Sequence, residues 1–83
     1  MKELLREFEG KGEVRRWHFK QLMKSDMAYM YQKTFEDIVY YGVFRRIENN
    51  RFNCITYPGS TSFGIWAWDY RDYNKALAKF NRL

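Results

Sequence analysis

The sequence is poor in the residues that build most metal centres, disulfides and catalytic sites. Its 83 residues include one cysteine, one proline and one histidine. Because Cys54 is alone, an intramolecular disulfide is excluded, and we expect a reducing, cytoplasmic setting. One Cys and one His also cannot form the familiar clusters of metal ligands, so we expect no metal and no cofactor.

Long apolar runs are missing as well. No stretch approaches the roughly 18 apolar residues that a membrane span requires, so no membrane partner is expected. Residues 1–5 carry charges and lack a long apolar region, which argues against a signal peptide. There is no repeat, linker or low-complexity segment, and the length predicts a single domain covering residues 1–83.

Signals of catalysis are equally scarce. His18 and Cys54 could in principle act as base and nucleophile, but the strand pattern places them on opposite faces of a sheet. A lone buried Cys is usually a small hydrophobic residue. Asp69 and Asp72 have the spacing of a helix-capping pair rather than of a catalytic pair. The sequence therefore predicts a protein that is not an enzyme.

Aromatic residues and positive charge are what the chain has in excess. Phe, Trp and Tyr make up 20% of the residues, and the formal net charge is +5. A chain this short has a small core, so some of these aromatic side chains are expected at the surface. The charge favours anionic partners, nucleic acid among them, although it also aids solubility.

The order of sequence patterns predicts an α+β fold. Residues 13–57 alternate as strands do, and residues 69–83 have helical spacing. We expect an antiparallel meander of about four strands, with a C-terminal amphipathic helix packed on one face. A short N-terminal helix over residues 2–9 is a further expectation, because Leu4, Leu5 and Phe8 share a helical face.

The start of the C-terminal helix is predicted from its charges and aromatic residues. Asp69 is placed as the N-cap and Asp72 at the third helical position. Trp68 and Tyr73 match a hydrophobic staple. Trp66 and Trp68 point to the same side if the run is extended, and both are expected to be structural. The apolar stripe that packs on the sheet comprises Tyr73, Ala76, Leu77, Phe80 and Leu83.

Three turns define the predicted strand registers. Asn49-Asn50 as a hairpin tip places Ile47 opposite Phe52. A loop over residues 34–37 places Tyr31 opposite Tyr40, and a turn at Ser25-Asp26 places Leu22 opposite Tyr29. Because side chains alternate along a strand, these registers give two faces. The first comprises Trp17, Phe19, Met23, Ala28, Met30, Val39, Tyr41, Val43, Ile47, Phe52 and Cys54. The second comprises Arg16, His18, Lys20, Tyr29, Tyr31, Lys33, Tyr40, Phe44, Arg46, Ile55 and Tyr57.

The second face mixes basic and aromatic side chains, as sheets that bind single-stranded nucleic acid do. It gives a predicted nucleic-acid or partner-binding site at Arg16, Lys20, Tyr29, Tyr31, Lys33, Tyr40, Phe44, Arg46 and Tyr57. Two other interpretations stay open. The face could be half-solvated or covered by the N-terminal segment. It could also bind protein, as a homodimer or as an inhibitor or accessory protein.

Three segments, "YGVFRR", "NCITYP" and "SFGIWAWDYRDYNKALAKFN", together resemble a family of small uncharacterised bacterial proteins of the kind carried on phage or mobile elements. The resemblance extends over roughly residues 10–82. It implies a stand-alone accessory protein, and it implies no activity and no functional residues.

Overall fold

A five-stranded antiparallel sheet forms the main layer of the protein in the computed structural model, which describes residues 1–83. The strand order is β1-β2-β3-β4-β7. The α+β class, the antiparallel meander and the C-terminal helix on the sheet are confirmed. The strands are β1 (Glu7–Glu9), β2 (His18–Lys24), β3 (Ala28–Phe35), β4 (Ile38–Arg45) and β7 (Ala67–Tyr70).

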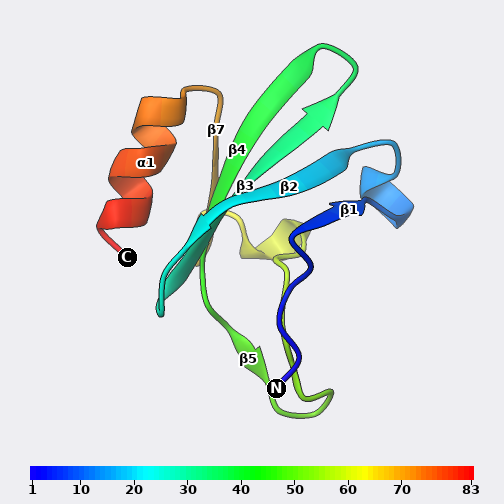
Figure 1. Cartoon of the computed structure of the whole chain (residues 1–83), viewed down its shortest axis with the longest axis vertical. Helices are drawn as coiled ribbons and strands as arrows, with labels where there is room; N and C mark the ends of the chain where they lie inside the picture. Colours follow the sequence, from blue (N-terminus) through cyan, green and yellow to red (C-terminus); the bar gives the residue numbers. More distant parts are fainter.

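Smaller elements complete the fold on either side of this sheet. Figure 1 shows the helix α1 (Tyr73–Asn81) on one side, and the N-terminal segment with a two-stranded ribbon on the other. The ribbon consists of β5 (Glu48–Asn49) and β6 (Cys54–Ile55). Two 3₁₀ turns are η1 (Gly12–Val14) and η2 (Ser60–Ser62).

The helix covers the sheet face that carries Met30 and Val43. These two side chains and Ala76 of α1 are fully buried and form one cluster. The predicted apolar stripe is confirmed for Ala76, Leu77 and Phe80 of α1 and for Leu83 just beyond it, which belong to or pack on this cluster. Tyr73 is instead 40% exposed and contacts Tyr41. Burial of such a stripe stabilises a nine-residue helix that would be marginal in isolation.

The helix begins three residues later than predicted. Asp72 is the N-cap, and its carboxylate accepts hydrogen bonds from two backbone N–H groups of the first turn. Asp69 belongs to β7, so its predicted capping role is wrong, as is the staple between Trp68 and Tyr73. The reason is that pairing of β7 with β4 continues to Tyr70 and keeps the chain extended.

The two neighbouring tryptophans pack on opposite faces of the sheet, contrary to prediction. Trp66 lies in a turn before β7 and packs against Phe44, with ring centroids 6.4 Å apart. Trp68 lies on the helix side, where the Lys79 ammonium is 3.8 Å from its ring centroid. The turn breaks the strand alternation between them, and both side chains are partly buried.

The N-terminal segment is extended, so the predicted helix over residues 2–9 is wrong. Lys2 forms a parallel bridge with Cys54, and residues 7–9 form β1 at the sheet edge. Leu4 and Phe8 pack against the sheet from this extended chain. An eight-residue helix is marginal, whereas an open sheet edge offers unpaired N–H and C=O groups to a segment that joins it.

The β3–β4 register differs from the predicted one by two residues. Glu36 and Asp37 alone form the turn, so Tyr31 lies opposite Gly42 rather than Tyr40. Glu36 has a φ of 54°, which a tight two-residue turn requires. A shift of two residues leaves every side chain on its predicted face.

A bulge in β2 does move side chains between faces. The pairing with β3 changes between Gln21 and Met23, so the predicted pairing of Leu22 with Tyr29 is wrong. Phe19 and Trp17 consequently pack on the side of Tyr31, not with Met30 as predicted.

The β5–β6 hairpin has a longer loop than predicted. Glu48 pairs with Ile55 and Asn49 with Cys54, which leaves residues 50–53 as the loop. The predicted opposition of Ile47 and Phe52 is therefore wrong. Phe52 is instead exposed in this loop.

Asp72→Ala should lower the free energy of unfolding by about 1 kcal/mol, because two N–H groups of the first helical turn lose their acceptor. Urea denaturation measures the loss. Asp26→Ala is the matched control, since Asp26 lies exposed in the β2–β3 turn. An equal change in both variants would contradict the assignment of the cap.

His18 fastens β1 to β2 through two acidic residues. Its two ring nitrogens contact the carboxylates of Glu9 and Glu7, one residue at each end of β1. These contacts, that of Glu9 first, raise the pKa of His18 above 6.5. The stabilisation is therefore complete below about pH 6.5 and is lost as the pH rises through the higher pKa of the folded protein.

NMR titration of the His18 ring protons should give a pKa above 6.5. In the variant that combines Glu7→Gln and Glu9→Gln, the pKa should return towards 6.5, because neither neighbour is then charged. A wild-type pKa at or below 6.5 would contradict the described contacts.

Candidate ligand-binding cleft

The predicted binding face is the core of the protein on the side away from α1. Tyr29 and Tyr31 are 0% exposed and Phe44 is 1% exposed. Ile55 of the ribbon and the partly buried Leu4, Tyr57 and Trp66 pack over them. The predicted exposure of these three aromatic side chains is wrong. The alternative interpretation, in which the N-terminal segment covers the face, is confirmed.

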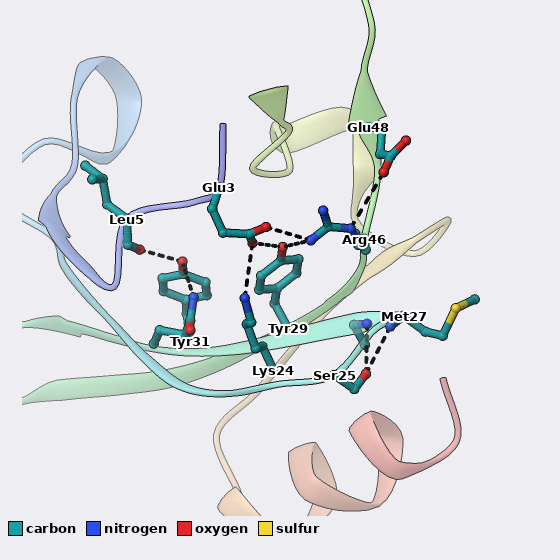
Figure 2. Close-up of polar contacts among 11 residues, drawn as sticks. Glu3, Leu5, Lys24, Ser25, Met27, Tyr29, Tyr31, Arg46 and Glu48 are labelled. Atoms are coloured by element: carbon teal, nitrogen blue, oxygen red, sulfur yellow. Dashed lines mark hydrogen bonds and ion pairs between the residues drawn. The ribbon is translucent and has the colours of Figure 1, made fainter. Parts of the chain in front are cut away.

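Hydrogen bonds of the two buried tyrosines hold the N-terminal segment in place (Figure 2). The Tyr29 hydroxyl donates to the Glu3 carboxylate, and the Tyr31 hydroxyl donates to the Leu5 carbonyl oxygen at 2.6 Å. Arg46 Nη1 donates to both Glu3 (2.9 Å) and the Tyr29 hydroxyl oxygen (2.6 Å). The hydrogen bond from Tyr29, together with Arg46, lowers the pKa of Glu3, and burial raises the pKa of both tyrosines.

The other predicted site residues are dispersed. Arg16 is exposed in the turn before β2, with a φ of 74°. Lys20 is exposed on β2. The Tyr40 ring lies 6.0 Å from the Trp17 ring, between centroids, and under the Arg71 guanidinium. These side chains do not form one surface with the tyrosines.

Lys33 and Tyr57, by contrast, meet in a cleft of about 730 Å³. One wall comes from β1 and η1, and the other from the segment after β6, with Pro58 and Phe63. Four of the 15 lining residues are aromatic and five are charged. The cleft volume lies in the range of small-molecule sites. The lining residues are Leu5, Phe8, Glu9, Gly10, Lys11, Glu13, Val14, Phe19, Lys33, Tyr57, Pro58, Gly59, Ser60, Phe63 and Asp69.

The lining includes an ion pair between Lys33 and Asp69. Lys33 Nζ lies 2.7 Å from Asp69 Oδ1, and the side chains are 13% and 34% exposed. The pair reaches from β3 to β7 across β4. Gly42 of β4 permits this, because a Cβ there would lie 3.2 Å from Asp69 Oδ1. The Lys33 ammonium also lies 5.0 Å from the Phe63 ring centroid.

Tyr57 joins the cleft to the core. Its ring packs edge-on against Phe8, Phe19 and Phe44, with centroid distances of 5.7, 5.4 and 5.0 Å. Its hydroxyl is buried without a hydrogen-bond partner. Burial, with a smaller contribution from Asp69, raises the pKa of this hydroxyl.

Of the lining residues only Lys33 and Tyr57 were predicted as site residues, and Asp69 and Phe63 are the two missed ones that contact Lys33. Asp69 was assigned to the helix cap, and Phe63 was given no role. The available signal was Gly42, an isolated glycine in a strand of large side chains, which often marks a close approach of another group.

No group of three or more His, Cys, Asp and Glu residues could hold a metal ion. With nine residues, α1 falls short of the length that a membrane-crossing helix needs, and there is no other α-helix. Comparison of the chain with protein-family models, with curated proteins and with solved structures found no significant match. The resemblance to a family of phage or mobile-element proteins therefore stays a prediction.

A double-mutant cycle should measure the coupling free energy between Lys33 and Asp69. Asp69→Asn and Lys33→Met should each destabilise the fold, and the double variant should be about 1–2 kcal/mol more stable than additivity predicts. Urea denaturation of the four proteins measures this coupling energy. Strictly additive effects would show that the ion pair contributes nothing.

Proposed function

We propose that the chain is a non-catalytic binding protein that contacts single-stranded nucleic acid by taking an unpaired base into the cleft. The observation that carries the proposal is an aromatic-walled cleft with an ion pair in its lining. Proteins that bind single strands stack splayed-out bases on aromatic side chains and bond the base edges with polar groups. Phe63 and the Lys33–Asp69 pair offer both kinds of contact in one place.

The cleft replaces the flat tyrosine surface as the proposed contact. Base–aromatic stacking is worth about 1–3 kcal/mol for each base, but only where the ring can be reached. Tyr29, Tyr31 and Phe44 cannot be reached in the folded protein. The rings of Phe8 and Phe63 line the cleft and are partly buried.

Positive charge supports a polyanionic partner. The net charge is +5, and Lys11, Arg16 and Lys20 are exposed on the side of the molecule built by residues 7–20. In this proposal Arg16 and Lys20 contact phosphates outside the cleft, Lys11 contacts a phosphate from the cleft lining, and the cleft holds the base. We also propose a cytoplasmic location, which the single free Cys54 supports.

Two exposed apolar side chains favour a second candidate, a protein-interaction module. Leu5 and Val14 both line the cleft and are 61% and 44% exposed. Apolar side chains around an aromatic pocket are typical of a contact that a protein partner buries, a second copy of the chain included.

Fluorescence anisotropy with a dye-labelled ten-residue single-stranded DNA tests the proposal. At low salt the wild type should bind, and Phe63→Ala should weaken binding by about 5- to 150-fold, because one stacking contact is lost. Binding should also weaken as salt is added, since phosphate contacts release counterions.

The matched control is Phe52→Ala, which removes the same ring from the exposed hairpin loop, outside the cleft. It should bind as the wild type does, and circular dichroism checks that both variants fold. Absence of wild-type binding at low salt would reject the nucleic-acid proposal and leave the protein-interaction module as the candidate. Equal weakening by both variants would place the contact outside the cleft.

A further inference from the structure

We propose that the cleft selects guanine among the bases. This inference rests on the proposed function, in which the base belongs to a nucleic acid. The choice of base follows from the chemistry of the cleft lining alone. The selecting groups are the Lys33 ammonium and the Asp69 carboxylate, which lie 2.7 Å apart and both line the cleft.

The ion pair favours a ligand without charge. An anionic ligand would compete with Asp69 for Lys33, and a cationic one would compete with Lys33 for Asp69. An uncharged ligand can bond to both, because each group keeps unused capacity. The ammonium has three N–H donors and the two carboxylate oxygens have about four acceptor sites, of which the pair uses one each.

Guanine matches this arrangement best among the four common bases. Its hydrogen-bonding edge carries the O6 acceptor beside two donors, the ring N1–H and the exocyclic N2 amino group. The two donors complement both oxygens of one carboxylate, and O6 accepts from an ammonium. Adenine, cytosine and uracil each offer only one donor group on the corresponding edge, so they leave a carboxylate oxygen without a partner.

The remaining lining favours the base over a free phosphate. Besides the ion pair, its charged residues are Glu9, Lys11 and Glu13, so the cleft carries no excess of positive charge. The Phe8 and Phe19 rings stack with centroids 4.8 Å apart, and Phe63 lies beneath Lys33. The Phe8 and Phe63 side chains are only partly buried, so a planar base can contact them in the cleft.

Titration of the wild-type protein with nucleosides, followed by NMR, tests the inference without any contribution from phosphate. Guanosine should bind about 5- to 150-fold more tightly than inosine, which lacks only the N2 amino group, and than adenosine, cytidine or uridine. Resonances of Phe63 and Asp69 should shift. Equal affinity for guanosine and inosine would overturn the inference.

Asp69→Asn should abolish the preference for guanosine over inosine, because an amide offers one acceptor where the carboxylate offers two. Asp26→Asn, in the exposed β2–β3 turn, should leave it unchanged. If Asp69→Asn does not fold, the comparison of guanosine with inosine on the wild type decides by itself.

Two further ligands distinguish a free guanine compound from guanine in a nucleic acid, and they test the two proposals independently. They are a ten-residue strand with one guanine and the same strand with hypoxanthine in its place. Preference for guanosine without binding of either strand would support a free guanine compound as ligand and reject the proposed function. Binding of both strands with equal affinity, weakened by Phe63→Ala, would support the proposed function and reject guanine selection.

Discussion

The fold depends on how two buried tyrosines satisfy their hydroxyl groups. A tyrosine ring contributes a large apolar area to a core, but a hydroxyl buried without a partner is costly. Tyr29 and Tyr31 are adjacent on one face of β3, and both hydroxyls find partners in the first five residues. The N-terminal segment is consequently held over the sheet, and it excludes water from the aromatic face.

The cleft is a consequence of this anchoring. Once Glu3 and Leu5 are bound, the chain continues into β1 and brings Phe8 onto Phe19 at the opposite edge of the face. The segment after β6 covers the face from the other direction and ends at Phe63. The cleft lies on the sheet between the N-terminal segment and the segment after β6. A single glycine in β4 lets Lys33 and Asp69 meet in its lining.

The proposed function depends on the same combination of apolar and polar side chains in the cleft. Had the tyrosines been exposed, the sheet would present a wide surface on which any base could stack. The covered face leaves only the cleft open, where, in the proposal, a planar base would meet the Lys33 and Asp69 side chains. A site of this kind discriminates by the donors and acceptors of its ligand, because a group left unpaired in it loses its contact with water.

The sequence by itself determined the α+β class, the alternation within β3 and β4 and the apolar stripe of α1, because these features follow from residue periods within one element. Even the two-residue error in the β3–β4 register left every face correct. The sequence could not determine which face of the sheet the N-terminal segment covers. The bulge at Leu22 moves Phe19 and Trp17 to the other face, and nothing in the local pattern requires it.

Only the tertiary structure brought Lys33 to Asp69, since 36 positions separate them along the chain and the contact passes over the strand between. Asp69 shows what the local sequence cannot predict. Its local context is a good helix cap, but pairing of β7 with β4 keeps it in a strand. Tertiary hydrogen bonds there outweigh a local capping preference worth about 1 kcal/mol.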